Sequence, residues 1–361
     1  MVIRKDEQAI FALRNLYRQY GYSQYKMSRF EEYDLYVRNK DFLISDEVIT
    51  FTDRSGRLLA LKPDVTLSII KNTVDRVGAV QKVYYNENVF RVAKGTHSFK
   101  EIMQAGLECI GDLQEYEIAE VLMLASKSLA LIGENYVLDL SHMGLVAAML
   151  SACALSEEGK GKALSFIHQK SAHELSALCV QEGLSQKAEQ KLLALCRQSG
   201  DARQVLDALK PLLETEEELA AFEEFSALCA ILAEEKIRLD FSVGNDMKYY
   251  SGVVFKGYIE GIPASVLSGG QYDKLLQKMG RKSGAIGFAV YLDLLERLNR
   301  EKADYDFDIL LLREEDADSA ALIQAVEQLQ KEGSVLVAKA PPEDLRFCKV
   351  LKFTKGGLQN G

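Results

Sequence analysis

Residues 101–111, EIMQAGLECIG, place Gln104, Gly106 and Glu108 at alternate positions of an otherwise apolar segment. Successive side chains of a β-strand point to opposite faces, so these three residues share one face if the segment is a strand. A carboxylate accepts hydrogen bonds from charged donors, and an amide both donates and accepts them. Gln104 and Glu108 together therefore suit a zwitterion or an imidazole, although the same spacing also fits a solvent-exposed strand face.

Two polar groups lie upstream of this segment. The sequence LKPDVT at 61–66 places Asp64 and Thr66 near a predicted helix start, where either side chain could instead cap the helix. Arg91 ends the strand predicted at 80–91. These positions are candidates for a site on the same sheet, with helix capping as the alternative for Asp64.

Two more segments of this kind lie downstream. Tyr249 and Tyr250 lead into the β-rich segment 249–259, where ordinary aromatic packing in a strand is the alternative to a binding role. The sequence SGGQYD at 268–273 is typical of a glycine turn before a helix. Each of these signals is weak when it is taken alone.

The hydrophobic periodicity changes twice along the chain. An amphipathic helix predicted at 4–20 opens a region of mixed helices and strands. Residues 144–235 are rich in Ala, Leu, Glu and Lys and predict several short helices, after which strand character returns from 237. From 304 onward a β-α-β-β pattern of about 55 residues begins, which is too small to be a full α/β domain.

Composition and motifs narrow the class of protein. The 361 residues carry a net charge of −9, which lowers the expectation of a phosphate-rich partner such as RNA. Neither a membrane span nor a secretory signal is predicted, so we expect a cytoplasmic protein. The six cysteines form no CxxC pair and the four histidines show no ligand spacing. We therefore expect buried thiols and no metal site, and no sequence motif indicates a cofactor.

In their order and separation these segments resemble the catalytic core of class II histidyl-tRNA synthetases. The resemblance runs from residue 1 to about residue 300, through YGYSQYKMSRFE, LKPDVT, FR, QAGLE, YYSGVVF, GGQYD and AIGFAVYLDLLERL. It implies an α+β fold with a six-stranded antiparallel sheet flanked by helices. The implied domains are a synthetase-like core at 1–143 and 236–301, a helical insert at 144–235, and a small truncated C-terminal α/β unit at 302–361.

The resemblance implies that the amino-acid pocket of the family is kept. Asp64 would bind the α-ammonium group on a shorter stem than the family's glutamate, and Glu108 would hold the imidazole ring. Arg91 matches an arginine that contacts the substrate carboxylate and phosphate. The implied histidine-binding residues are Asp64, Thr66, Arg91, Gln104, Glu108, Tyr249 and Tyr250.

The same resemblance implies that residues which bind and position the nucleotide in the family have been replaced in this chain. Leu294 stands where the third motif of the family has a nucleotide-binding arginine, and a leucine offers no donors to a triphosphate. Tyr291 replaces a glycine of that motif, and Ala93 replaces a glutamate of the second motif. Asn245 replaces an arginine that polarises the histidine carboxylate, and Ser28 replaces a first-motif proline.

This selective loss favours histidine binding without adenylation, and the tail is too short for the anticodon-binding domain of those synthetases. The combination resembles the ATP phosphoribosyltransferase regulatory subunits, which are synthetase paralogues. It implies a non-catalytic subunit with histidine as its inhibitory effector and no tRNA. The implied partner is the short-form ATP phosphoribosyltransferase catalytic subunit, joined to a homodimer within a hetero-octamer. Two alternatives stay open: a divergent histidyl-tRNA synthetase, or a synthetase-like histidine-binding module with another partner.

Overall fold

The structure is a computed structural model that describes residues 5–39, 48–76, 78–92, 98–244, 250–295, 305–355 and 357–360. The chain divides into two compact units. Ala9–Leu295 forms the larger unit, and Glu296–Gly361 forms the smaller one together with Met1–Gln8. No helix among the described residues has the length and apolar character needed to cross a membrane.

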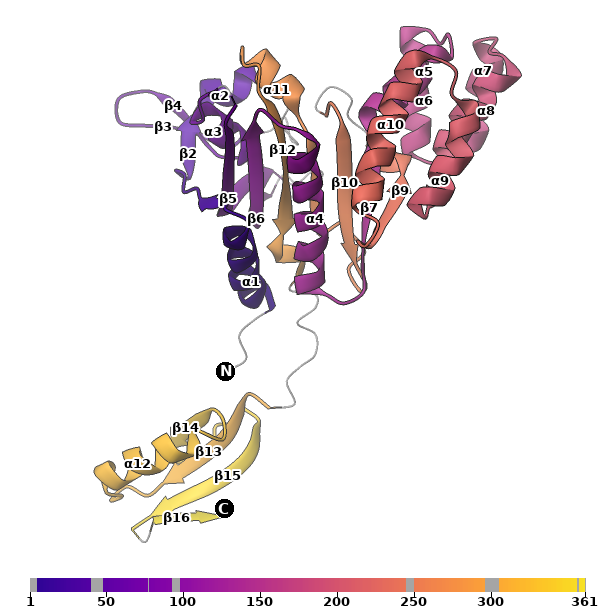
Figure 1. The fold of residues 1–361 in the computed structure, drawn as a ribbon. Helices are drawn as coiled ribbons and strands as arrows, with labels where there is room; N and C mark the ends of the chain where they lie inside the picture. The colour runs from indigo at the N-terminus through magenta and orange to yellow at the C-terminus, as the bar shows by residue number, and fades with distance from the viewer. Residues whose placement is uncertain are drawn as a thin grey trace. The chain divides into compact units, whose positions relative to one another are not determined.

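A nine-stranded sheet organises the larger unit (Figure 1). In spatial order its strands are β1 (Ser23–Gln24), β5 (Val80–Val92), β6 (Phe99–Gly111), β12 (Gly284–Tyr291), β11 (Leu267–Gln271), β10 (Val253–Ile259), β7 (Tyr136–His142), β9 (Ile237–Asp240) and β8 (Ser199–Gly200). The six strands from β5 to β7 pair antiparallel throughout. The predicted antiparallel sheet flanked by helices is thus confirmed, and it is extended at its margins, where β1 and β9 pair in parallel with β5 and β7.

Strand β11 includes a segment that the sequence predicted as a turn. Gly269 and Gly270 lie in the middle of the sheet, between β12 and β10, and not at a chain reversal. A Cβ atom on Gly269 would collide with the carbonyl oxygen of Gly287 and the side chain of Phe288. The glycines are therefore required by close packing, which overrides the local preference of Gly-Gly for turns.

Helices cover both faces of the sheet. On one face lie α1 (Lys5–Gln19) and α4 (Glu115–Ile132), where the Tyr17 hydroxyl shares a 3.1 Å hydrogen bond with Ser128. The opposite face is covered through a common apolar core by smaller elements. These elements are α2 (Tyr33–Arg38), α3 (Thr66–Lys71), α11 (Asp273–Lys278) and a three-stranded sheet of β2 (Phe30–Glu32), β4 (Leu58–Leu61) and β3 (Thr50–Thr52).

Six helices lie between β7 and β9 in the chain. They are α5 (Met143–Ala152), α6 (Glu157–His168), α7 (Ala172–Gln181), α8 (Gln186–Arg197), α9 (Ala202–Leu209) and α10 (Glu216–Ile231). Several begin at a residue whose side-chain oxygen accepts a backbone N–H three residues on, as at Ser156, Ser185, Asp201 and Thr215. The boundaries proposed for this insert and for the other domains stay predictions.

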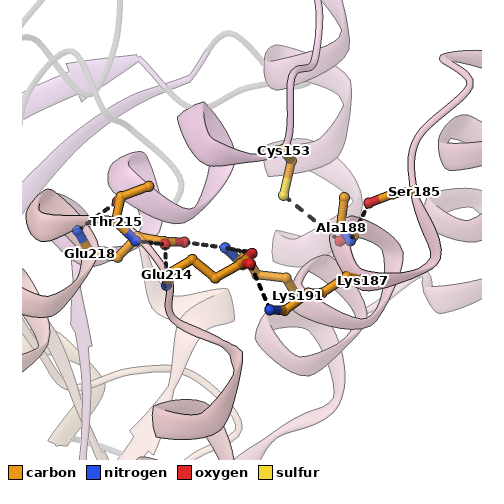
Figure 2. A network of polar contacts seen from close by, with 8 residues as sticks. All are labelled: Cys153, Ser185, Lys187, Ala188, Lys191, Glu214, Thr215 and Glu218. Atoms are coloured by element: carbon orange, nitrogen blue, oxygen red, sulfur yellow. Dashed lines mark hydrogen bonds and ion pairs between the residues drawn. The ribbon is translucent and has the colours of Figure 1, made fainter.

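A buried ion pair fixes two of these helices (Figure 2). The Lys191 ammonium of α8 lies 2.5 Å from the Glu218 carboxylate of α10, and both side chains are at most 2% exposed. The other oxygen of Glu218 accepts the backbone N–H groups of Glu214 and Thr215, each at 2.9 Å. Thr215 in turn accepts the N–H of Glu218 at 3.2 Å, which completes a capping box at the start of α10.

Replacing Glu218 should destabilise the insert strongly. Glu218→Ala leaves the buried Lys191 ammonium without its closest partner and removes the acceptor of two N–H groups. We expect the free energy of unfolding to fall by about 3–5 kcal/mol, measured by urea denaturation followed by circular dichroism. The matched control is Glu157→Ala, whose carboxylate is 90% exposed in its pair with Lys160, and we expect little change there. Equal losses in the two variants would contradict the role of the buried pair.

The smaller unit has its own sheet, β14 (Val335–Ala338), β13 (Phe307–Arg313), β15 (Phe347–Thr354) and β16 (Gly357–Asn360). Helix α12 (Ser319–Leu329) packs on one face of it. The β-α-β-β order predicted from the sequence is present, but β16 was not predicted, because four terminal residues carry too little apolar pattern. Cys348 is exposed, contrary to the expectation of buried thiols, because it alternates with the β15 residues that face α12.

Candidate functional site

A pocket opens on the sheet face that carries α3 and α11. It spans about 480 Å³ of unfilled space, including its open mouth, and β5, β6, β12 and β11 form its floor. Strand pairing places Glu108 opposite Gly287, and Gly287 opposite Gly270, so these three residues form one row across the floor. The next row contains Gly106 opposite Ala289, and Ala289 opposite Ser268. Small residues thus leave the sheet surface hollow at this place.

Each of three floor glycines makes room for one pocket side chain. A Cβ atom on Gly106 would collide with the Tyr85 hydroxyl, and one on Gly287 would collide with the Glu108 carboxylate. A Cβ atom on Gly270 would lie 2.6 Å from the Tyr250 ring. None of these glycines has a left-handed φ, so space and not backbone conformation requires them.

Glu108 lies at the bottom of the pocket with its carboxyl group fully engaged. The Thr66 hydroxyl donates to one of its oxygens at 2.7 Å, and the Tyr272 hydroxyl donates to the other. Burial raises the pKa of Glu108 to about 8, an effect that the two hydroxyl donors reduce and the Asp64 carboxylate increases.

Asp64 and Arg91 form the charged wall of the pocket. One oxygen of Asp64 accepts the backbone N–H of Leu67 at 3.0 Å, so the side chain caps the first turn of α3 as well as lining the pocket. Burial raises the pKa of Asp64, while the N–H bonds and the Arg91 charge act in the opposite direction. The Nε atom of Arg91 donates to the Pro63 carbonyl at 3.1 Å, which orients the guanidinium group.

The structure brings most of the predicted site residues together. Six of them line this one pocket: Asp64, Thr66, Arg91, Gln104, Glu108 and Tyr250. Tyr249, the seventh, lies outside the described residues. Sequence reasoning assigned no role to Tyr85 or Tyr272, although both line the pocket. The signal that could have located the pocket was two glycines within strand-like segments, Gly106 and Gly287, since such glycines mark close approach.

Only some of the positions at which the resemblance implies a lost nucleotide contact lie among the described residues. Tyr291 lines the pocket, whereas Leu294 is half-buried and does not line it. Ala93 and Asn245 lie outside the described residues, and Ser28 is exposed. Among the residues that the structure describes, no cluster of three His, Cys, Asp or Glu side chains could hold a metal ion.

Comparisons with known proteins converge on one family. A family model described as histidyl-tRNA synthetase matches residues 2–295. An ATP phosphoribosyltransferase regulatory subunit from Clostridium novyi is 30% identical over 292 residues, which are 78% of this chain and 69% of that protein. A histidine–tRNA ligase from Methanocaldococcus jannaschii is 26% identical over 344 residues, which are 92% of this chain and 82% of that protein.

A solved structure agrees on the fold. It is described as an ATP phosphoribosyltransferase regulatory subunit/histidyl-tRNA synthetase from Bacillus halodurans C. It superimposes with a TM-score of 0.78 at 24% identity, and the match covers 97% of this chain and 94% of that one. At this identity the likeness shows that the two chains share a fold.

Filling the floor of the pocket should destabilise the protein. Gly287→Ala places a methyl group against the Glu108 carboxylate, and the buried surroundings leave that side chain little room to move. We expect the free energy of unfolding to fall by about 1–3 kcal/mol. The matched control is Gly161→Ala on the exposed side of α6, where no atom lies near the new Cβ. That helical substitution should instead stabilise by about 0.5–1 kcal/mol.

The raised pKa of Glu108 should make stability depend on pH. The pKa rises from 4.5 to about 8, so between these values the folded state binds more protons than the unfolded state. The free energy of unfolding therefore falls as the pH rises from about 5 to 8, by at most about 1.4 kcal/mol per pH unit for one proton. Glu108→Gln lacks this titration, so denaturation across the range should show a flatter profile for the variant. Parallel profiles would contradict the raised pKa.

Proposed function

Because the chain belongs to the histidyl-tRNA synthetase family, and within it to the ATP phosphoribosyltransferase regulatory subunits, we propose that it regulates and does not catalyse. In this proposal, a short-form ATP phosphoribosyltransferase needs this subunit for activity in the first step of histidine biosynthesis. Histidine bound in the pocket inhibits the complex. The chain itself performs no aminoacylation and acts in the cytoplasm.

The observation that carries the proposal is the asymmetry of the pocket. Six of the seven residues that the resemblance implied for histidine binding line one pocket around Glu108. Tyr291 occupies the pocket edge, and Leu294, which lies outside the pocket lining, offers no donor to a nucleotide phosphate. A site that keeps one substrate's contacts and lacks those of the other is suited to sensing and not to adenylation.

The pocket offers complementary groups for each part of histidine. Asp64 supplies an acceptor for the α-ammonium group, and Arg91 supplies N–H donors for the carboxylate. The imidazole ring would lie toward Glu108, with the Tyr250 ring packed beside it over Gly270. Because these groups are largely desolvated, a ligand that leaves one of them without a partner would bind more weakly.

Histidine can inhibit only by binding more tightly to the less active arrangement of the complex. The coupling between two such sites is typically about 1–3 kcal/mol, and it is reciprocal. Partner binding would therefore change the affinity for histidine by the same factor. The names of the curated relatives support a catalytic partner, and we propose a homodimer of this chain within a hetero-octamer that binds no tRNA.

The alternative function is a divergent histidyl-tRNA synthetase. The similarity to the Methanocaldococcus jannaschii ligase, which extends over 92% of this chain, favours it. Histidine-dependent exchange between ATP and pyrophosphate discriminates between the two functions, because a regulatory subunit that cannot adenylate histidine gives no exchange.

The central experiment reconstitutes the chain with a purified short-form ATP phosphoribosyltransferase. We expect the complex to be active and to be inhibited by histidine, whereas the catalytic subunit alone should have little activity. In Glu108→Gln, calorimetry should show histidine affinity weakened by about 1–3 kcal/mol, because the buried carboxyl group is lost. Inhibition should then require correspondingly more histidine, while assembly with the catalytic subunit is kept.

The matched control is Glu101→Gln, at the exposed end of the same strand. It should leave histidine affinity and inhibition unchanged. Unchanged affinity in Glu108→Gln would contradict the pocket assignment. Histidine binding without any assembly would instead favour a binding module with another partner, and pyrophosphate exchange would favour the synthetase.

A further inference from the structure

Tyr291 ends the row of small residues on the pocket floor. It is the last residue of β12, and strand pairing places it opposite Gln104. Gly287 and Ala289 precede it on the same face, so the floor changes abruptly from small side chains to a phenol ring. Gln104 lies four residues before Glu108 on β6, which places the Tyr291 row about 13 Å from the Glu108 row.

The contacts of Tyr291 hold its ring at this end of the pocket. Its hydroxyl lies near Arg91 and Ser268, and the same serine lies near Tyr250. Its backbone N–H donates to the Val266 carbonyl at 2.8 Å, which fixes the end of β12 against the chain before β11. The side chain is half-buried, so these contacts leave the ring little freedom to swing away.

Arg91 defines which end of a ligand meets Tyr291. In the proposed function, Arg91 is the group that receives the ligand carboxylate, and Glu108 lies toward the imidazole. A ligand oriented in this way has its carboxylate beside the Tyr291 hydroxyl. Any atoms attached to that carboxyl group would then extend toward the ring.

We propose that Tyr291 closes the carboxylate end of the pocket and so determines ligand specificity: it admits a free amino acid and excludes one extended beyond its carboxyl group, as in a peptide or an ester. The inference rests on the proposed function for the orientation of the ligand. Beyond that function, one side chain is assigned the discrimination between histidine and its esters or amides. Overfilling a packed site typically weakens binding by about tenfold or more, which is enough for strong selection.

The test compares two ligands on the full-length chain by calorimetry, L-histidine and the dipeptide L-histidyl-glycine. For the wild type we expect the dipeptide to bind at least about tenfold more weakly. In Tyr291→Ala and Tyr291→Val this ratio should fall by several-fold from its wild-type value, because the ring is removed, and only the penalty at Arg91 should remain. The valine variant keeps a residue that favours strands, so it covers the case in which the alanine variant fails to fold. Displacement of the carboxylate from Arg91 penalises the dipeptide in every variant alike.

Two control variants test whether the effect arises from the size of the Tyr291 ring. One removes only its hydroxyl group, and the other removes a hydroxyl group at the opposite end of the pocket. Tyr291→Phe keeps the ring and should keep the ratio of the wild type. Tyr272→Phe removes a hydroxyl at the Glu108 end, so it should weaken both ligands by similar factors and leave the ratio unchanged. An unchanged ratio in both Tyr291→Ala and Tyr291→Val would overturn this inference while histidine binding itself survives. Absence of histidine binding in the wild type would overturn the proposed function as well.

Discussion

The site depends on one constraint, which is the buried carboxyl group of Glu108. This group lies on a part of the sheet where the neighbouring residues are small. Glu108 is almost fully buried, so its two oxygens need hydrogen-bond donors from the protein, and Thr66 and Tyr272 supply them. These partners come from α3 and from the chain after β11, which places both elements over the floor. The need to satisfy one carboxyl group therefore determines how the covering elements meet the sheet.

Sequence reasoning predicted the structure best where a residue pattern is compatible with few structures. The family resemblance carried by the order of the motifs implied an antiparallel sheet, and alternation along 101–111 predicted that Gln104 and Glu108 share a face. Both now lie in one pocket with Asp64 and Arg91, which come from other segments. Asp64 shows that two interpretations can hold together, because it both caps a helix and lines the pocket.

Local preference failed where packing across the sheet decides the structure. Gly269 and Gly270 favour a turn in isolation, yet strand neighbours and the Tyr250 ring require them inside β11. The sequence predicted no site role for Tyr85 or Tyr272, because a tyrosine near a strand normally packs against its neighbours. Their role follows only from the register of distant strands, which no single segment contains. The added edge strands β1, β8 and β16 are short and make few contacts that a local pattern could reveal.

The order of strands in the large sheet has a consequence for synthesis. β6 and β7 follow one another in the chain, but β12, β11 and β10 lie between them in the sheet. A nascent chain that has just produced β7 therefore presents three unpaired strand edges, one on β6 and two on β7, and these stay open while the whole helical segment is being made. Such intermediates are prone to associate with one another.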